Sequence, residues 1–526
     1  MKKIHIKSVI FGLAALALTA CGEPADELTS ASYPRNFSPT SFEAKVRNRT
    51  NVELSWNKGD GVTNYNVEVY ENDSLTFAGS PIRTYTVTPD QVPFTVEYLN
   101  GETKYSFRVQ AITEGDAARD SKWSSAYAKT DAEQIFYTVA EEDIQPTAVT
   151  LRWPAGQEAA TITLNPGNIV YQVTAADVAA GAATITGLMP ETNYTAVLAR
   201  DNGRTRGTVK FITGVVLEET DILVKSGSNL AKIIADAPDG YRLVIEPGTY
   251  PLADSEKASG ATIKISKSIA LKGLRPNDHP VIMGRFQVEN SLALSQVTLD
   301  GEGTDGGQAF DYTAEGSIAA LDIANCEIRN YTKGFFYINK AVVINSINID
   351  NCIISNIECS GGDLFDSRAG GYNEFYLTNS TIYNSAKSRD VFRMDDASKN
   401  VTASPYICVD HCTFSQVGSG NANYRFFYTR FAGNKIVFTN NIVADFNNKR
   451  GFANQKGTDQ DPTLDNNVYF NTKNLISADD TADATISWFD SKGTVLDPKF
   501  ADAANGNFTI GNDNVKDTGA GDPRWY

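Results

Sequence analysis

A short pattern recurs through the C-terminal half of the chain, in which apolar residues alternate around a central asparagine or histidine. The segments are LDIANCEI (321–328), INIDNCII (347–354), YLTNSTI (376–382), ICVDHCTF (407–414), VFTNNIV (437–443) and TLDNNVYF (463–470). Their central residues, Asn325, Asn351, Asn379, His411, Asn440 and Asn466, follow at intervals of 26, 28, 32, 29 and 26 residues. This spacing predicts a β-solenoid, because each coil buries its apolar face only by stacking on its neighbours.

We expect the central residues to form a ladder inside the solenoid, with amide side chains bonding to the coils above and below. His411 is then a rung of this ladder rather than a metal ligand or a base. Cys326, Cys352 and Cys412 each follow a rung, which predicts that they fill the interior as small apolar side chains. A Cys326–Cys352 bridge between adjacent coils is the alternative.

A second alignment places a phenylalanine at the same position of each coil. The segments GFFYINK (334–340), DLFDSR (363–368), DVFRMDD (390–396), RFFYTR (425–430) and GFANQ (451–455) align on Phe336, Phe365, Phe392, Phe427 and Phe452. Strand side chains alternate between two faces, so these phenylalanines share one face. We place them inside, since the opposite choice would bury charges at a cost of several kcal/mol each.

The outer face then carries two columns of polar side chains, which we call the charged panel. One column is Tyr337, Asp366, Arg393 and Tyr428, and the other is Asn339, Arg368, Asp395 and Arg430. Stacked strands lie about 4.8 Å apart, so the panel is compact. One interpretation is structural pairing of opposite charges across coils. The other is a saccharide site, in which arginine binds a sugar carboxylate, tyrosine packs on a sugar ring and aspartate binds hydroxyls or a cation.

The start of this region predicts a cap. Residues 227–238, SNLAKIIADAPD, have the apolar spacing of an amphipathic helix, and GYRLVIEPGTYPL (240–252) follows as a strand and turn. A helix followed by a strand ending in PGTY resembles the N-terminal cap of the pectate-lyase-like right-handed parallel β-helix. The resemblance assigns residues 215–526 to this fold, with the last coils and a cap from about residue 470.

The segment DLFDSR, followed by NSTI and then DVFR, is similar in layout to the chondroitinase B and alginate lyase family. By position, the resemblance makes Asp363 a cation ligand, puts Arg368 where that family has a lysine base, and puts Arg393 where it has an arginine. Asp366 is the nearest candidate for a second cation ligand, so the resemblance implies Ca²⁺. Lys387, on the loop before the third of these coils, joins Arg368 and Arg393 among the catalytic candidates.

The substrate-binding candidates are the remaining panel residues: Tyr337, Asn339, Asp395, Tyr428 and Arg430. A polygalacturonase-like hydrolase is disfavoured, since Asp395-Asp396 lacks the histidine and basic motifs that would accompany such a pair. Two functions remain open: a lyase that cleaves a uronate-containing polysaccharide by β-elimination, and a glycan-binding protein that uses the same face without cleavage. A polysaccharide is the expected partner in both.

Two small sandwiches are predicted before the solenoid, at 34–130 and 131–214. The first has an early tryptophan, Trp56, and the segment LNGETKY (99–105); the second has Trp153 and LMPETNY (188–194). Both segments resemble the tyrosine corner of fibronectin type III domains. The expected fold class is therefore all-β, with two fibronectin type III-like sandwiches, read as spacers, followed by the parallel β-helix.

The first residues, MKKIHIKSVIFGLAALALTAC, have the basic start and short apolar stretch of a secretory signal. Leu18-Thr19-Ala20-Cys21 resembles the bacterial lipobox, which implies a signal peptide over 1–20 and lipidation of Cys21. The acidic tether over 21–33 is similar to the export signal of Bacteroidota surface lipoproteins. This implies an outer-membrane lipoprotein at the cell surface, with the periplasm as the alternative, and a glycan uptake system as a partner.

Composition narrows the other classes. The net charge of −16 argues against nucleic acid as a partner. The six cysteines include Cys21, and the other five, Cys326, Cys352, Cys359, Cys408 and Cys412, form no CxxC pair, so neither a disulfide scaffold nor a structural zinc site is expected. With three histidines in 526 residues, Ser-His-Asp chemistry is poorly supported.

Overall fold

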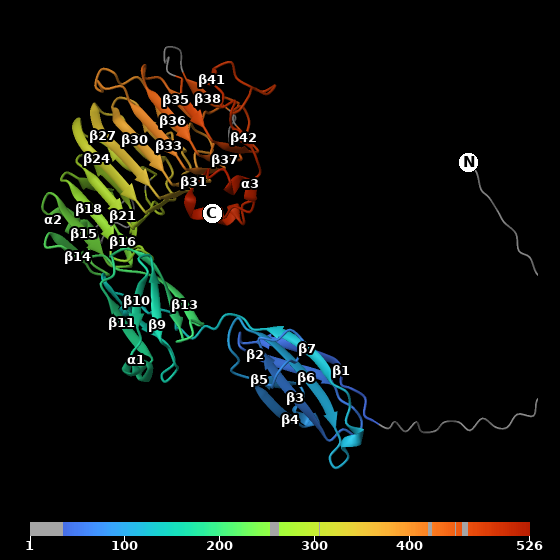
Figure 1. Ribbon diagram of the computed structural model, residues 1–526. Helices are drawn as coiled ribbons and strands as arrows, with labels where there is room; N and C mark the ends of the chain where they lie inside the picture. Colours follow the sequence, from blue (N-terminus) through green and yellow to red (C-terminus); the bar gives the residue numbers. More distant parts are fainter. Residues whose placement is uncertain (1–34, 253–261, 305, 419–422, 448, 455–460) are drawn as a thin grey trace, which may run out of the picture.

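The computed structural model describes residues 35–252, 262–304, 306–418, 423–447, 449–454 and 461–526. The predicted signal peptide, Cys21 and the tether lie outside these residues. Figure 1 shows three bodies along the chain, two small sandwiches and a large solenoid. Within the described ranges, no helix has both the length and the apolar character needed to cross a membrane.

The first sandwich has two antiparallel sheets. One is β1 (Thr40–Arg47), β2 (Asn51–Asn57) and β5 (Phe94–Val96); the other, in spatial order, is β4 (Arg83–Val87), β3 (Asn64–Glu71), β6 (Lys104–Ile112) and β7 (Ser124–Lys129). Short 3-10 helices are η1 (Pro89–Gln91) and η2 (Ala117–Arg119). Trp56 is buried in the core of this sandwich, and its ring centre lies 5.1 Å from that of Tyr65. The Tyr105 hydroxyl accepts a hydrogen bond from the backbone N–H of Asn100 at 2.9 Å, which confirms the tyrosine corner.

The second sandwich repeats this arrangement. Its sheets are β8 (Ala148–Arg152) with β11 (Ala182–Thr186), and β10 (Ile169–Gln172), β9 (Thr161–Asn165), β12 (Asn193–Ala199) and β13 (Thr205–Ile212). Helices η3 (Glu141–Asp143) and α1 (Ala175–Ala180) lie in its connections. Trp153 is buried in the core, and the Tyr194 hydroxyl accepts from the backbone N–H of Met189 at 3.0 Å. Both predicted tryptophan cores are confirmed.

The solenoid has about eight turns and three sheets, all parallel except for the last pair of the third sheet, β38 and β41. The first sheet contains β14 (Asp221–Val224), β15 (Tyr241–Ile245), β18 (Ile269–Gly273), β21 (Leu292–Ser295), β24 (Gly316–Ala324), β27 (Val342–Asp350), β30 (Gly371–Thr378), β33 (Tyr406–Asp410), β36 (Lys435–Thr439) and β39 (Thr463–Asp465).

The second sheet contains β16 (Thr249–Pro251), β19 (Val281–Met283), β22 (Thr298–Asp300), β25 (Glu327–Arg329), β28 (Ile353–Ser355), β31 (Thr381–Tyr383), β34 (Thr413–Ser415), β37 (Ile442–Ala444), β40 (Val468–Phe470) and β42 (Thr494–Val495). The third contains β17 (Thr262–Ile265), β20 (Arg285–Val288), β23 (Gln308–Tyr312), β26 (Gly334–Ile338), β29 (Phe365–Ser367), β32 (Phe392–Met394), β35 (Phe427–Thr429), β38 (Phe452–Asn454) and β41 (Ile486–Trp488).

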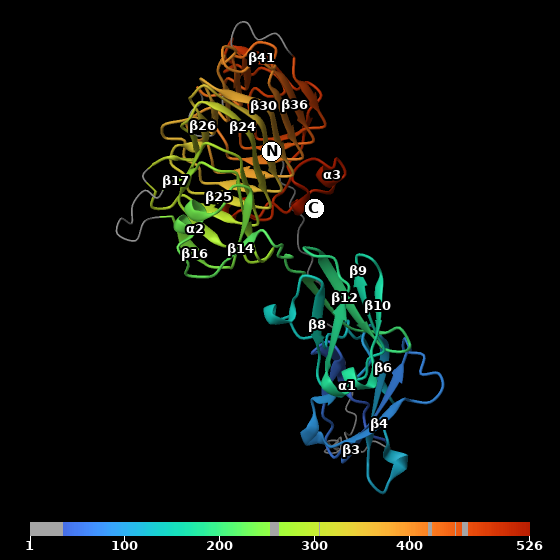
Figure 2. The ribbon, with the colours of Figure 1, turned by 90° about the vertical axis from the view of Figure 1, so that its left-hand side faces the viewer.

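The solenoid begins under the predicted cap helix, α2 (Leu230–Asp236). Asn229 caps it by accepting a hydrogen bond from the backbone N–H of Lys232 at 2.9 Å. Leu230 and Ile234 are buried against the first coils. The helix therefore covers apolar side chains at the open end of the stack, where Figures 1 and 2 show it.

The phenylalanine alignment is confirmed. Strand pairing places Phe336, Phe365, Phe392, Phe427 and Phe452 opposite one another on successive coils. All five are buried, and the Phe392 ring lies 4.9 Å from that of Phe365 and 4.6 Å from that of Phe427. This stack fixes the register of the third sheet, so the residue after each phenylalanine faces outward.

The predicted internal ladder is wrong by one residue. Its rungs sit at the corner between the first and second sheets with φ of 47° to 55°, and Asn325 and Asn466 are exposed. Asparagine tolerates this left-handed conformation, which makes the sharp corner and turns the rung outward. The side chain of Asn466 still donates to Asn440 at 2.7 Å, so bonding between coils exists, but on the surface.

The interior position is the next residue of each coil. Cys326, Cys352, Ser380, Cys412, Asn441 and Asn467 are all buried there. Side chains at this position accept backbone N–H groups of the preceding coil: Cys412 donates to Asn441 Oδ1 and Asn441 to Asn467 Oδ1, both at 2.9 Å. The cysteines thus fill the interior as predicted, and as free thiols, without the alternative Cys326–Cys352 bridge.

The tail after β42 folds back rather than adding further coils to the end. It contains η4 (Ala503–Asn505), α3 (Asp513–Lys516) and η5 (Pro523–Trp525). The Asp522 carboxylate accepts from Thr381 at 2.7 Å, and the Trp525 indole donates to the same hydroxyl at 2.7 Å. The C-terminus is thereby held against the second sheet near β31, as Figure 1 shows.

Candidate functional site

The charged panel lies on the outer face of the third sheet. Strand pairing aligns Tyr337, Asp366, Arg393 and Tyr428 in one column. The second column continues past the strand ends, where backbone N–H groups still bond to the preceding coil. These are Arg368 to Ile338, Asp395 to Ser367 and Arg430 to Met394, at 2.9, 2.8 and 2.7 Å. The sequence therefore predicted the positions of both columns.

The first charged pair, Asp366 and Arg368, lies on β29 and just after its end. Arg368 donates Nε to Asp366 Oδ1 and Nη2 to Asp366 Oδ2, both at 2.8 Å. The two residues are two positions apart, so their side chains leave the strand on the same face. Asp366 is fully buried, with Oδ2 also accepting from the backbone N–H of Asp363 at 3.2 Å.

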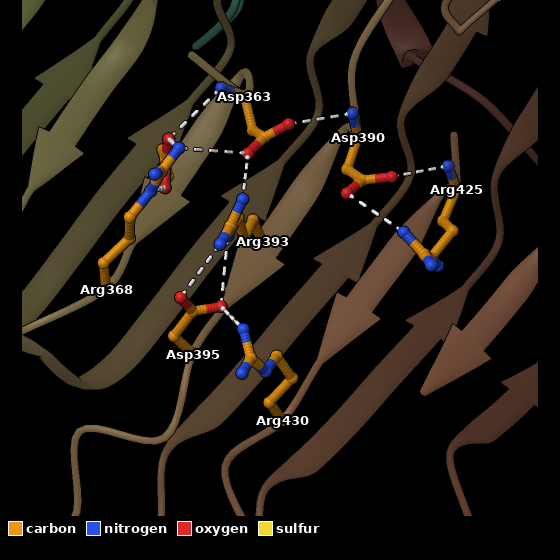
Figure 3. Close-up of polar contacts among 8 residues, drawn as sticks. Asp363, Arg368, Asp390, Arg393, Asp395, Arg425 and Arg430 are labelled. Carbon is orange, nitrogen blue, oxygen red and sulfur yellow. Dashed lines mark hydrogen bonds and ion pairs between the residues drawn. The ribbon is translucent and has the colours of Figure 1, made fainter. Parts of the chain in front are cut away.

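Arg393 on β32 joins two coils (Figure 3). Its Nε and Nη2 bind Asp395 at 3.1 and 3.0 Å, and its Nη1 lies 3.3 Å from Asp363 Oδ2. The same Asp363 oxygen lies 3.6 Å from Arg368 Nη2. Asp363 therefore sits between two guanidinium groups. On the other side of Asp395, Arg430 Nη1 donates at 3.2 Å.

A further pair, Asp390 and Arg425, was not singled out from the sequence. Asp390 is 3% exposed; its carboxylate accepts from the backbone N–H of Arg425 at 2.7 Å and lies 3.5 Å from the Arg425 guanidinium. Its own N–H donates to Asp363 Oδ1 at 3.1 Å. Asp363, Asp390 and Arg425 each precede an aligned phenylalanine by two residues, so the same alignment contained this third column.

Tyrosine rings cover part of this network. The guanidinium of Arg425 lies 4.0 Å from the ring centre of Tyr428, and those of Arg393 and Arg430 lie 5.6 and 5.7 Å from it. Three cations thus lie close to one aromatic ring, whose π electrons attract them. On the preceding coils, Arg368 lies 5.3 Å from the ring of Tyr337.

The charges of the panel differ in depth, which corrects the expectation that placing the phenylalanines inside leaves every charge unburied. The side chains of Arg368 and Arg430 are 29% and 36% exposed, and Arg393 and Asp395 are less so. Asp363 and Asp366, in contrast, are at most 1% exposed. Arg368 and Arg430 are therefore the more solvent-exposed groups, and the carboxylates of Asp363 and Asp366 lie below them.

Burial changes the pKa values of the buried aspartates Asp363 and Asp390. It raises the pKa of Asp390 to about 7, helped by the neighbouring Asp363 charge and opposed by Arg425. Burial and the charge of Asp366 likewise raise the pKa of Asp363. For Arg393, burial lowers the pKa, but the hydrogen bond and charge of Asp395, together with Asp363, outweigh burial and raise it.

The predicted Ca²⁺ ligands are occupied by protein donors. Both oxygens of Asp366 bind Arg368, and the oxygens of Asp363 bind Arg393 and the backbone N–H of Asp390. Within the described residues, no group of three or more His, Cys, Asp and Glu side chains is arranged to hold a metal ion. This donor set does not fit a Ca²⁺ site, which needs several free oxygen ligands.

Two predicted residues lie at the margin. Asn339 is exposed just after β26. Lys387 lines a separate polar hollow of about 500 Å³ at the corner between the second and third sheets, together with Glu302, Glu358 and Asn384. The structure thus brings Arg368 and Arg393 together through Asp363, but places Lys387 with a different set of side chains.

Three family models match parts of the chain, one in the first sandwich and two in the solenoid. Residues 37–127 match the fibronectin type III domain. Residues 248–385 match a domain of unknown function (DUF4957), and residues 407–525 match a second one (DUF5123). The first match agrees with the two-sheet sandwich seen there. No curated protein compared with the chain matches it.

Among solved structures, the chain is similar to a two-domain fibronectin type III segment of chicken tenascin, at 14% identity and a TM-score of 0.24, covering 34% of this chain and 98% of that one. It is also similar to the FN1–FN3 domains of chicken CNTN1, at 15% identity, a TM-score of 0.15, and 34% and 65% coverage. A central fibronectin type III array of RIM-binding protein gives 16% identity, a TM-score of 0.14, and 35% and 62% coverage.

Proposed function

We propose that the chain captures a uronate-containing polysaccharide on the charged panel, with arginine holding sugar carboxylates and tyrosine packing on sugar rings. The observation that carries this proposal is the half-exposed edge formed by Arg430 and Tyr428. Among the described residues, Arg430 donates only Nη1, to Asp395, so its other N–H groups are available to a ligand. A guanidinium beside an aromatic ring suits a pyranose that carries a carboxylate.

The charge balance supports an anionic ligand at this place on an acidic protein. The network contains four arginines and four aspartates: Arg368, Arg393, Arg425, Arg430, Asp363, Asp366, Asp390 and Asp395. With all of them ionised, its net charge is zero. Burial raises the pKa of Asp390 to about 7, and protonation of this carboxyl near neutral pH shifts the network toward positive charge.

Binding without cleavage is favoured over β-elimination by the state of the arginines. A lyase base must accept a proton, whereas the hydrogen bond from Arg368 to Asp366 raises the pKa of Arg368 and keeps it cationic. Lyase activity is the second candidate, supported by the placement of Arg368 and Arg393 on adjacent coils around Asp363, as in the layout of the chondroitinase B and alginate lyase family.

Asp363 and Asp366 are already paired with arginine, so the sugar carboxylate would be neutralised by arginine rather than by a Ca²⁺ ion held on these aspartates.

We also propose a location for the protein, at the outer surface of the cell. Leu18-Thr19-Ala20-Cys21 and the acidic tether support a lipoprotein of Bacteroidota type, anchored through Cys21 and facing the cell surface. The two sandwiches would then hold the solenoid away from the membrane. A polysaccharide captured there would pass to an outer-membrane glycan uptake system.

The test uses pectin, alginate and glycosaminoglycans. Affinity electrophoresis of the full chain measures retention, and absorbance of unsaturated uronate measures elimination. Retention without product, weakened by Arg430→Ala, is the expected result. Product formation that is lost in Arg368→Ala would instead support the lyase. If no polymer is retained and none is cleaved, both functions are wrong and the panel only stabilises the fold.

A further inference from the structure

The third sheet has cations at both of its margins. The residues three positions before the aligned phenylalanines lie where the chain enters the sheet, and we call them the entry margin: Lys333, Gly362, Arg389 and Tyr424. The residues three positions after the phenylalanines form the exit margin, the second column of the charged panel: Asn339, Arg368, Asp395 and Arg430. Six residues of extended chain separate the two margins, so the strip between them is about 20 Å wide.

Each of the four coils from β26 to β35 carries one cation at its margins, and the side alternates from coil to coil. The pairs, with the entry residue first, are Lys333 and Asn339, Gly362 and Arg368, Arg389 and Asp395, and Tyr424 and Arg430. We call the four cations the alternating row: Lys333, Arg368, Arg389 and Arg430. The position across from Arg389 holds a carboxylate, Asp395, so an anion is favoured at only one end of that coil.

Stacking keeps the coils in register almost as far as the entry margin. The backbone N–H of Val391 donates to the Arg425 carbonyl of the next coil at 3.1 Å. Arg425 directly follows Tyr424, and Val391 lies two residues after Arg389. Stacked coils lie about 4.8 Å apart, so neighbouring cations of the alternating row differ by one coil along the solenoid axis.

The entry cations are not used to hold the fold together. Lys333 is exposed and Arg389 is half-buried, and among the residues that the structure describes neither forms an ion pair. The Arg389 guanidinium lies 5.8 Å from the ring centre of Tyr424 on the next coil, a contact that orients it. Arg393 and Arg425, between the margins, instead form ion pairs with buried aspartates. The margins therefore offer the cations that an anionic ligand can reach.

The exit cations also keep donors for a ligand. Within the described part of the chain, Arg368 binds Asp366 through Nε and Nη2, and Arg430 binds Asp395 through Nη1. Both side chains are partly exposed. Nη1 of Arg368 and Nη2 of Arg430 are therefore available to a carboxylate. In Figure 3, Arg430 lies at the end of the network opposite Asp390.

The alternating row matches one kind of acidic polymer. In an extended polysaccharide with two sugars per helical turn, successive sugars direct their carboxylates to opposite sides of the chain. Each pyranose advances such a chain by about the rise of one coil, ~4.8 Å. A polymer lying along the solenoid axis then presents one carboxylate to each cation of the row. A polymer with uronate at every second sugar would present all its carboxylates to one margin and meet only half of the row.

We propose that the third sheet binds a homopolymer of uronate along the solenoid axis, with Lys333, Arg368, Arg389 and Arg430 holding the carboxylates of four successive sugars. This inference rests on the function proposed for the charged panel and adds the arrangement of acid groups that the ligand must have. Lys333 and Arg389 are then the residues that distinguish a chain with an acid on every sugar from one with an acid on alternate sugars.

Calorimetric titration of the full chain with galacturonate, mannuronate and guluronate oligomers of two to six sugars tests the arrangement. We expect the affinity for the best-bound series to rise up to four sugars and to change little beyond. Lys333→Gln and Arg389→Gln should each weaken binding of the tetramer about tenfold, the effect of losing one charged hydrogen bond. Lys333 is exposed, so its variant keeps the test valid if Arg389→Gln disturbs the turn. Lys435→Gln, which removes an exposed lysine from β36 of the first sheet, should leave the affinity unchanged.

A hyaluronan tetrasaccharide, in which uronate alternates with a neutral amino sugar, is the comparison ligand and should bind about tenfold more weakly than the uronate tetramer. Equal affinity for the two would overturn the alternating arrangement. Binding that is weakened by Arg430→Ala but not by either entry variant would also overturn it, while uronate capture by the panel would stand. If no uronate oligomer binds, the proposed function is wrong and this inference is wrong with it.

Discussion

Arg393 Nη1 lies 3.3 Å from the Asp363 carboxylate of the preceding coil, although that carboxylate is only 1% exposed. A buried carboxylate of this kind depends on its cationic partner, because the uncompensated charge would be costly. The pair also orients the guanidinium that the proposed ligand would meet. The same contact therefore affects both the stability of the fold and the proposed binding. Variants must be chosen so that the two effects can be told apart.

Arg393→Ala should lower the free energy of unfolding by about 3 kcal/mol, because it leaves Asp363 buried beside Asp366 with one cation fewer. Arg430→Ala removes a more exposed cation and should cost less than about 1 kcal/mol. Urea unfolding of both variants measures the difference. Equal losses would show that Asp363 does not rely on Arg393.

The raised pKa of Asp390 should make the free energy of unfolding fall as the pH rises toward 7. Its pKa is about 7 in the folded protein against 3.8 for the free group, so the folded state binds more protons in this window. This contribution to stability is present below pH 4 and is lost as the pH rises through 7. The fall in unfolding free energy from pH 5 to pH 8, measured in EDTA, should shrink in Asp390→Asn. The exposed Asp278→Asn serves as control, and an unchanged fall in Asp390→Asn would refute the assignment.

Chelation should leave polymer binding intact. Arginine donors occupy Asp363 and Asp366, so retention on a uronate polymer should be the same with EDTA as with added Ca²⁺. Affinity electrophoresis in the two buffers makes the comparison. Loss of retention in EDTA would restore the Ca²⁺ site that the family resemblance implies.

The phenylalanine stack should dominate the stability of the third sheet. Phe392→Ala removes a ring that contacts Phe365 and Phe427 and should cost about 3–5 kcal/mol. Tyr98→Ala removes a ring that is 81% exposed and should change stability little. Thermal unfolding followed by circular dichroism tests both. A small effect of Phe392→Ala would mean that the core tolerates the cavity by collapse.

Period-two alternation was enough to predict the buried phenylalanines and both panel columns, because register in a parallel stack is set by which face is buried. The ladder was misplaced by one residue because a left-handed corner, as at Asn351, interrupts the alternation. The burial of Asp366 could not be predicted, since the Arg368 guanidinium and the Asp363 backbone N–H that contact its carboxylate depend on the folded geometry.

Recognition of sugar carboxylates by the charged panel is the central claim. The decisive measurement is calorimetric titration of the full chain with the best-retained uronate polymer and with the same polymer after its carboxyl groups are reduced to alcohols. We predict that reduction weakens binding at least tenfold, and that Arg430→Ala weakens binding of the unreduced polymer alone. Equal affinity for the two polymers would contradict the account.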